Sequence, residues 1–392
     1  MPPRLIVIIL GTFTALAPLS IDMYLPALPL MQTDFAATAT QVQITLAAFL
    51  AGFALGPGLY GPLSDGWGRK VPLYGGLGLF TLASAACLVA PSVEMFTVAR
   101  FFQAIGACAG GVLGRAVVRD LYPPQMTHQV YASLMLVMGA APIIAPIAGG
   151  LLIKLFGWRS IFAVLTVAGL ACLLLLHFWL RESHPRHLRR RVNLWSAALA
   201  YGRLLSDRPF MAYALAGSVG MAGLFGYISG APYVLIQYHG VPTDHFGWIF
   251  GLNAFGFILA GQINGRVLHK FDRHKVMVVA QWAQVVLSLI LAVVAATDFG
   301  GVVGLSAALF PAIACMGFIV PNSAILVMAP HGGAMAGTAS ALMGTLQFAI
   351  GAGASALVGM VHAHSALPMA AVMAAFAALG PLSLRLLPKR ML

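Results

Sequence analysis

The chain has 392 residues, of which 60% are hydrophobic and only 8% are Asp, Glu, Lys or Arg, against about 25% charged residues in an ordinary soluble domain. So much apolar surface must face lipid, which excludes a cytosolic enzyme, a secreted disulfide scaffold and a disordered tail. The formal charge of +12 does not indicate a nucleic-acid partner, because the basic residues lie in short clusters between apolar runs. The four cysteines stand singly, without the paired spacing of metal sites, so no metal centre is expected.

Twelve apolar stretches reach the length of roughly 20 residues that a helix needs to cross a bilayer. The first follows Arg4 like a secretory signal, but its apolar run is too long for one and no cleavage pattern follows. The sequence therefore predicts an all-α membrane protein with transmembrane helices over Leu5–Met31, Val42–Leu63, Val71–Ala90, Met95–Val118, Val130–Leu155, Ser160–Leu180, Phe210–Tyr238, Phe246–Leu268, Val276–Ala296, Gly300–Val320, Met335–His362 and Leu367–Leu387.

The distribution of Lys and Arg predicts the orientation, because these residues are retained on the cytoplasmic side of a membrane. With the N-terminus inside, every Lys and Arg except Lys154, Arg159 and Arg100 falls in a cytoplasmic connection or terminus. Lys154 and Arg159 fall outside, and Arg100 lies within the fourth segment. We therefore expect a multi-pass protein with both termini in the cytoplasm.

The connections divide the chain into an N-terminal six-helix half (1–180), a basic cytoplasmic linker (181–209) and a C-terminal six-helix half (210–392). Apolar residues from Leu194 to Leu205 predict a short linker helix among the inner lipid headgroups, and the alternative is a solvated linker. Gly61–Lys70 leaves the second segment much as Gly261–Lys270 leaves the eighth. Two related six-helix halves are typical of transporters.

The most specific motif is Gly61-Pro62-Leu63-Ser64-Asp65-Gly66-Trp67-Gly68-Arg69-Lys70, between segments two and three. It resembles the Gly-x-Leu-x-Asp-Arg-x-Gly-Arg-Lys signature of the major facilitator superfamily. Gly66 stands where the family usually has Arg, so any salt bridge of that Arg is absent or replaced. Two other patterns are similar to family motifs. Arg100, Gln103 and Gly106 resemble the Arg-x-x-Gln-x-x-Gly pattern of the fourth helix. Pro146, Gly149 and Gly150 resemble the end of an antiporter motif in the fifth helix, in which Ala145 replaces the usual Gly.

Three shorter stretches resemble the bicyclomycin and chloramphenicol resistance subfamily of drug/proton antiporters: Asp22-Met23-Tyr24-Leu25-Pro26, Arg119-Asp120 and Gly337-Thr338-Ala339-Ser340-Ala341. The resemblance covers essentially the whole chain. It implies the major facilitator fold, with two pseudo-symmetric six-helix halves, in the bacterial inner membrane. It also implies a small-molecule drug as the substrate, the proton as the coupling ion without any other cofactor, and a monomer in the lipid bilayer.

The turn motif is expected to control conformation. The family implies that Asp65 approaches the start of segment eleven, near Gly332 to Gly337, and latches the halves, since a carboxylate stabilises a helix N-terminus by roughly 0.3–1 kcal/mol. The alternative is that Asp65 and Arg69 only form a topology-setting turn. Arg115 and Arg119 lie four residues apart and share one helix face. We expect them to anchor the cytoplasmic end of the helix together with Asp120, and the alternative is a contact in a gate. Gating roles are expected for Gly61, Asp65, Gly68, Arg69, Lys70, Arg115, Arg119, Asp120, Pro146, Gly149 and Gly150.

Asp22 is the only acidic residue that falls well inside a predicted segment. An ionised carboxylate in hydrocarbon is costly, so such residues usually face a water-filled cavity and mark proton pathways. We therefore expect Asp22 to be the proton-coupling carboxylate. Because Pro18, Pro26 and Pro29 can bend or end this helix, the alternative is an Asp at the outer interface. Thr14 stands where some related antiporters have another acid, so Asp22 alone would respond to both proton and substrate.

Arg100 is the one cation inside a segment toward its outer side. We expect it to take part in proton coupling, either by pairing with Asp22 across the N-terminal half or by polarising a buried polar network. The alternative is an arginine whose side chain extends along the helix to the outer headgroups.

A drug cavity needs aromatic and aliphatic walls with a few polar groups. Taken singly, each candidate is also explained by ordinary packing, and only Tyr24 gains support from its position beside Asp22. The candidate substrate-binding residues are Asp22, Tyr24, Gln43, Phe49, Met135, Tyr227, Asn253, Trp282, Met343 and Gln347.

The sequence has no Gly-x-x-x-x-Gly-Lys-Ser/Thr loop, so transport is expected to use an ion gradient rather than ATP. Our first expectation is proton-coupled export of small, moderately apolar drugs, similar to chloramphenicol or bicyclomycin, by alternating access. The alternative within transport is an importer or a metabolite exporter on the same scaffold. A polytopic membrane enzyme is disfavoured, because a single intramembrane carboxylate does not make a catalytic cluster.

Overall fold

The computed structural model describes residues 3–189, 194–330, 334–361 and 365–387, and in them twelve helical stretches are long and apolar enough to cross a membrane. The predicted number of transmembrane helices is confirmed. The α-helices are α1 (Pro3–Asp22), α2 (Leu28–Asp34), α3 (Ala39–Trp67), α4 (Lys70–Val89), α5 (Val93–Leu121), α6 (Pro124–Phe156), α7 (Arg159–Phe178), α8 (Leu194–Leu205), α9 (Arg208–Pro232), α10 (Thr243–Val267), α11 (Arg273–Thr297), α12 (Gly301–Ala314), α13 (Met316–Met328), α14 (Ala334–Met360) and α15 (Leu367–Ser383).

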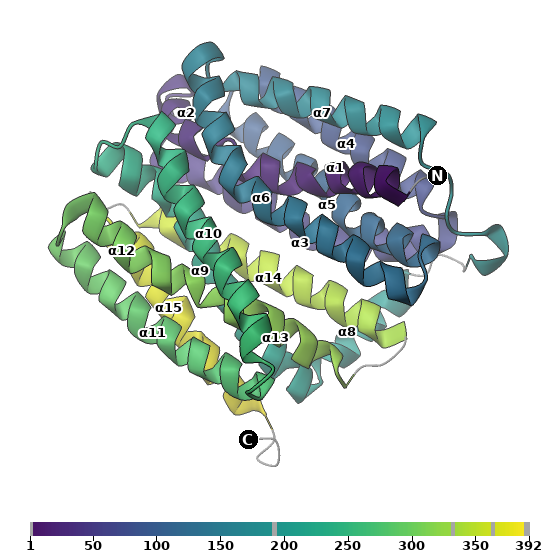
Figure 1. The fold of residues 1–392 in the computed structure, drawn as a ribbon. Helices are drawn as coiled ribbons and strands as arrows, with labels where there is room; N and C mark the ends of the chain where they lie inside the picture. The colour runs from purple at the N-terminus through teal and green to yellow at the C-terminus, as the bar shows by residue number, and fades with distance from the viewer. Residues whose placement is uncertain (1–2, 190–193, 331–333, 362–364, 388–392) are drawn as a thin grey trace.

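The helices form two groups, which we call the N-terminal half (α1–α7) and the C-terminal half (α9–α15) (Figure 1). Within the first half α5 packs on α3 and α4, and α1 packs on α6. The halves meet where α3 lies along α14 and α6 crosses α10. Because the described chain crosses the bundle an even number of times, the start of α1 and the end of α15 lie on one face together with α8, and we call it the terminal face.

Three of the spans are interrupted, and a proline precedes or occupies each break. The first span ends as α1 at Asp22 and resumes through a short 3₁₀ turn, η1 (Leu25–Ala27), that contains Pro26. The seventh passes after Pro232 into a π-helix, η3 (Tyr233–Tyr238). The tenth is divided into α12 and α13 at Cys315. Proline lacks the backbone N–H that a helix interior needs and so favours such breaks, but it does not impose them, because Pro57 and Pro146 lie inside the continuous helices α3 and α6.

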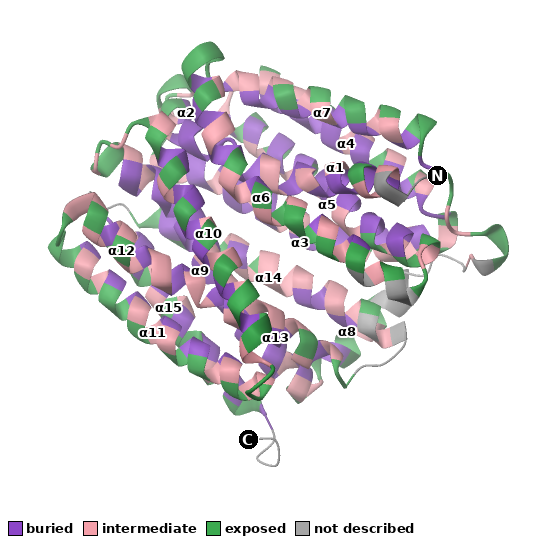
Figure 2. Ribbon diagram, viewed as in Figure 1, coloured by how far each residue is buried: buried purple, intermediate pink, exposed green. Residues whose placement is uncertain are grey.

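The outer surface of the bundle is apolar, as a lipid-facing surface must be. Leu82, Leu136 and Val303 are each more than 70% exposed, while large side chains such as Phe80 and Phe162 are fully buried. Figure 2 shows the same pattern, with exposed residues along the outer helix faces and buried ones between helices. The side chains outside the bundle therefore suit hydrocarbon rather than water.

The connector between the halves contains the predicted short helix as α8, preceded by η2 (Arg186–Leu188). α8 contacts α3, α9 and α14. Leu204 is 1% exposed and packs with Phe210 at the start of α9. This part of the connector is therefore packed on the bundle rather than free in solvent, and its predicted position among lipid headgroups stays a prediction.

Gly106 tests how closely the helices of the N-terminal half approach. A Cβ at Gly106 would collide with the backbone of α4 at Gly76 and Phe80, whereas Gly111 on the same helix has open space. We expect Gly106→Ala to lower the stability by about 1–3 kcal/mol, because backbone atoms cannot move aside. Thermal unfolding of the purified protein measures this, and Gly111→Ala, the control, should unfold like the wild type. Equal melting of both variants would contradict the close packing of α4 and α5.

Candidate functional site

Asp22 lies where the two halves meet. It is the last residue of α1, its side chain is only 4% exposed, and within the described residues its carboxylate has no hydrogen bond or ion pair. The η1 turn that follows it contacts α6 of its own half and α9 and α10 of the other. An exposed position at the outer interface is therefore not observed. A buried carboxylate without a partner is costly, and such groups concentrate at functional sites.

Two adjacent glycines of α6 set the spacing around Asp22. A Cβ on Gly149 would collide with the carbonyl of Met23, the residue after Asp22. A Cβ on Gly150 would lie 2.8 Å from the carbonyl oxygen of Thr243, at the start of α10 in the C-terminal half. Pro146 lies one turn earlier inside α6. The Pro-x-x-Gly-Gly pattern thus lets α6 touch the end of α1 on one side and the other half on the other side.

A tyrosine of the C-terminal half faces this junction. Tyr227 on α9 is 1% exposed, and its hydroxyl accepts a hydrogen bond of 3.0 Å from Nδ2 of Asn253 on α10. Its ring stacks on Phe250, with centroids 5.4 Å apart and planes 16° from parallel. The Asp22 carboxylate is close enough to act electrostatically on the Tyr227 hydroxyl. Three sequence-predicted residues, one from each of three helices, therefore gather at the contact between the halves.

Arg100, on α5, is fully buried and is surrounded by aromatic rings from other elements. Its guanidinium carbon lies 4.2 Å from the ring centroid of Tyr24 and 4.3 Å from that of Phe49. Nη1 donates to Gln103 Oε1 at 2.6 Å, and the Gln103 amide donates to Ser84 Oγ at 2.8 Å. Nε and Nη2 have no hydrogen-bond partner among the described residues.

This geometry decides between the positions considered for Arg100. Its side chain is 0% exposed, so it does not extend to the headgroups. It forms no ion pair with Asp22 within the described part of the chain; the salt bridges there involve other residues. The guanidinium instead belongs to a buried polar network with Gln103 and Ser84. Cation–π contacts of desolvated guanidinium groups contribute about 2 kcal/mol, which offsets only part of the desolvation cost.

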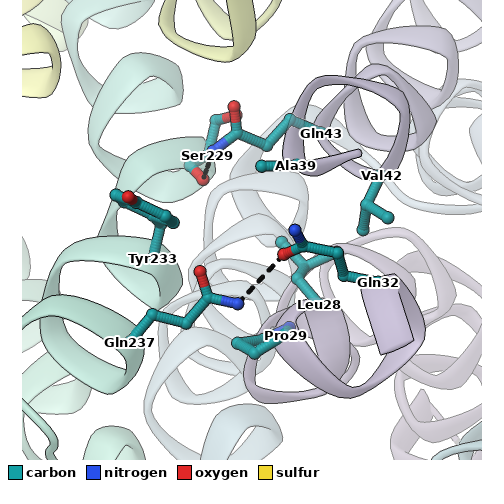
Figure 3. Close-up of a pocket in the computed structure, with 9 residues that line it drawn as sticks. All are labelled: Leu28, Pro29, Gln32, Ala39, Val42, Gln43, Ser229, Tyr233 and Gln237. Carbon is teal, nitrogen blue, oxygen red and sulfur yellow. Dashed lines mark hydrogen bonds between the residues drawn. The ribbon is translucent and has the colours of Figure 1, made fainter. Parts of the chain in front are cut away.

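The face opposite the terminal face is closed by polar contacts between the halves. A pocket of about 20 Å³, room for a single water, lies between α2, α3 and the seventh span (Figure 3). On one side of it Gln237 Nε2 donates to Gln32 Oε1 at 3.0 Å. On the other, Gln43 Nε2 lies 3.5 Å from the carbonyl oxygen of Ser229.

Two further contacts complete this closure. Thr40 Oγ1 donates to the carbonyl oxygen of Gly359 at 2.6 Å, joining α3 to α14. Lys154 pairs with Asp244 at 3.1 Å, joining α6 to α10. The pairing of Lys154 with Asp244 was not predicted, although Lys154 was one of the two cations expected outside. The role of Gln32 carried no sequence signal, because an isolated glutamine near a helix end is common.

Some of the remaining candidate residues for a drug cavity are buried in the bundle, and others are exposed on its surface. Tyr24 is buried, with its hydroxyl 3.4 Å from Thr45 Oγ1. Met343 and Gln347 lie on α14, the first buried and the second half-buried. Met135 and Trp282 are 55% and 57% exposed. Trp282 belongs to α11, which packs on α12, α13 and α15, so the structure does not bring it to the junction.

The turn motif forms an ionic network on the terminal face, inside the N-terminal half. The Arg69 guanidinium is buried and donates to Asp120 at 2.8 Å and to Asp65 at 2.8 Å. It also donates to Ser64 at 2.8 Å. Asp120 accepts a further bond from Ser183. The partner of Asp120 is therefore Arg69, and not Arg115 or Arg119.

The other motif residues lie around this network. Gly68 has a φ of +89°, and a Cβ there would meet Glu182 and Arg189. Lys70 Nζ donates to the carbonyl oxygen of His177 at 3.4 Å, and Gly61 has open space. Arg115 Nε donates to the carbonyl oxygen of Gly111, while Arg119 is exposed. Part of the stretch that Asp65 was expected to reach, residues 331–333, lies outside the described residues, so the latch stays a prediction.

Glu182 fastens the connector to the turn motif. Its carboxylate accepts backbone N–H bonds from Arg69 at 2.8 Å, Lys70 at 3.2 Å and His184 at 3.0 Å, and lies 3.5 Å from Arg189. Partial burial acts to raise the pKa of Glu182, but these N–H donors and the Arg189 charge outweigh it and lower the pKa below its ordinary value of 4.5. The network is thus strongest while Glu182 is ionised.

Among the described residues, no three His, Cys, Asp or Glu side chains gather in a way that could hold a metal ion. The residues gathered at the junction offer a carboxylate, a phenol and an amide, from Asp22, Tyr227 and Asn253. Such groups can bind and orient protons and hydrogen-bonding ligands.

Comparisons with known proteins agree with this arrangement. Residues 10–356 match the family model described as Major Facilitator Superfamily. An uncharacterized MFS-type transporter, YdgK, of Bacillus subtilis is 34% identical over 96% of the chain and 93% of its own length. A bicyclomycin resistance protein homolog of Haemophilus influenzae is 32% identical over 98% and 96%. A chloramphenicol resistance protein of Pseudomonas aeruginosa is 30% identical over 81% and 76%.

A solved structure shows the same fold. The xylose transporter XylE from E. coli, in a partially occluded inward open conformation, superposes with a TM-score of 0.74 over 97% of this chain and 96% of its own. The two sequences are 14% identical, so the likeness concerns the fold alone.

Gly247 tests the contact between α6 and α10. A Cβ at Gly247 would lie 2.8 Å from the backbone nitrogen of Ile147 in the other half, whereas Gly265 on the same helix has open space. We expect Gly247→Ala to hold the opposite face apart and to increase thiol labelling of a Gln43→Cys reporter at least severalfold. Gly265→Ala should leave the labelling unchanged. Identical labelling in both backgrounds would show that this contact does not close the face.

Glu182 gives a prediction for pH. A carboxylate whose pKa is lowered by folding contributes stability above its unfolded value and loses it as the pH falls through the folded one. We expect Glu182→Gln to lower the melting temperature by about 1–3 °C at neutral pH. This difference should begin to shrink only below about pH 4.5, the ordinary value, and should disappear as the pH falls through the lowered pKa of the folded protein. Melting curves of both proteins from pH 8 down into the acid range below pH 4 measure this. A difference that stays constant to the acid end of the range would contradict the assigned role of the charge.

Proposed function

The chain belongs to the major facilitator superfamily and to its bicyclomycin and chloramphenicol resistance subfamily, and from this premise we propose that it exports small, moderately apolar drugs in exchange for protons. It is a multi-pass inner-membrane transporter and not an enzyme. The proposed cargo resembles chloramphenicol or bicyclomycin, as the names of two relatives suggest. In the proposed orientation the terminal face, with both termini, is cytoplasmic.

The observation that carries the proposal is the unpaired, buried carboxylate of Asp22 at the contact between the halves. A carboxyl in this position changes charge without a fixed counter-ion, so its neighbours must respond to its proton. The described residues offer no second intramembrane acid to share the task. Competition of proton and drug for one group is the simplest exchange that this arrangement supports.

The transport cycle follows from alternating access. With the opposite face open, a proton from outside neutralises Asp22 and helps to displace the drug. With the terminal face open, Asp22 releases the proton to the cytoplasm and regains affinity for drug. Each proton that moves with the field gains about 2.3 kcal/mol per 100 mV, which can drive more than tenfold accumulation. The drug would lie against Gln43, Tyr227 and Asn253, with Tyr24 behind them in the interior of the N-terminal half.

Asp22→Asn tests the coupling. We expect it to abolish the proton release that a drug such as chloramphenicol stimulates in weakly buffered, purified protein, because the amide cannot titrate. Because the amide is neutral like the protonated carboxyl, drug binding measured at equilibrium should be weaker than in the wild type. A matched control is Asp34→Asn, since Asp34 lies outside the junction and pairs with Arg159. Drug-stimulated proton release that persists in Asp22→Asn would remove the proposed function.

A further inference from the structure

Tyr227 has a hydroxyl proton that the described contacts leave unused. The Asn253 Nδ2 group can only donate, so the Tyr227 oxygen accepts in that bond and its own O–H is left to donate elsewhere. Stacking on Phe250 fixes the ring, and both Tyr227 and Asn253 are 1% exposed. Bulk water therefore does not supply the missing acceptor.

Asp22, in contrast, lacks a hydrogen-bond donor. Its carboxylate oxygens accept no hydrogen bond from the described residues. It lies within electrostatic range of the Tyr227 hydroxyl, and the η1 turn beside it contacts the helices that carry Tyr227 and Asn253. A donor without an acceptor and an acceptor without a donor thus lie within electrostatic range of each other where the η1 turn contacts α9 and α10.

The other polar and charged groups on the elements around Asp22 do not bind it. Arg100 on α5 binds Gln103 through Nη1, and although its Nε and Nη2 have no partner among the described residues, it forms no ion pair with Asp22 there. The Tyr24 hydroxyl lies against Thr45. Lys154 on α6 pairs with Asp244 of α10, and Arg159 on α7 pairs with Asp34 of α2. Among the described residues, Tyr227 is therefore the group best placed to respond to the charge of Asp22.

We propose that Tyr227 is the positioning residue through which the C-terminal half senses the charge of Asp22: held by Asn253, its hydroxyl donates to the carboxylate whenever Asp22 gives up its proton. The bond joins the halves through α1 and α9 when Asp22 is ionised and is lost when Asp22 is neutral. This inference rests on the proposed function of Asp22. It adds the group that transmits the protonation state to the other half.

The test uses dicyclohexylcarbodiimide, which modifies protonated carboxyl groups, on the purified full-length protein without drug or gradient. Asp22→Asn identifies the label, because the modified mass must disappear in it. At a fixed pH where most of the wild type is unreactive, we expect Tyr227→Phe to raise the rate of Asp22 labelling about tenfold, the factor lost with one hydrogen bond to a charged group. Intact mass measured over time gives the rate.

Two further variants keep the test decisive. Tyr213→Phe removes another hydroxyl from α9, 3.2 Å from His274 Nδ1 and away from Asp22, and should label like the wild type. Asn253→Leu keeps the phenol but frees its orientation, so labelling should rise severalfold. Wild-type rates in both Tyr227→Phe and Asn253→Leu, or an equal rise in Tyr213→Phe, would overturn the inference. Neither result touches the drug-stimulated proton release of the wild type, which tests the proposed function separately.

Discussion

A charge enclosed by protein and lipid persists only where other groups replace the water it has lost. Arg100 and Asp22 meet this constraint differently. Arg100 is surrounded by rings and bound by the Gln103 side chain, although its Nε and Nη2 have no hydrogen-bond partner among the described residues. Asp22 has no such shell among the described residues. In the proposed function this carboxylate takes up and releases a proton, so its charge is present in only part of the transport cycle.

The two faces of the molecule are held by different kinds of interaction. On the terminal face, the ion pairs of Arg69 stay within the N-terminal half and its connector. On the opposite face, the halves touch through amides, a hydroxyl and closely packed glycines, with one exposed ion pair. Neutral hydrogen bonds of this kind contribute about 1 kcal/mol each, so they separate and re-form at low cost. Movement of one half against the other therefore breaks weak contacts while each half stays intact.

Much of the fold could be predicted because hydrocarbon imposes long apolar runs, and the prolines near Asp22 indicate the break in the first span. Asp22 stood out because acids inside such runs are rare. The partners could not be predicted in the same way. Tyr227 and Asn253 meet only through the packing of two helices, and nothing in a single sequence marks that contact. Trp282 suited a drug site by residue type, yet it lies on α11, away from the junction, because helix order and not composition decides which face turns inward.

Glu182 gives the connector a shorter free length than its sequence suggests. The carboxylate binds the backbone at Arg69 and Lys70, and Arg189 lies against it, so the first stretch after α7 belongs mechanically to the N-terminal half. At its other end, Leu204 is packed against the start of α9. The connector is thus attached to both halves, with α8 contacting α3, α9 and α14. If the halves separate as proposed, these attachments limit how far the terminal face can open.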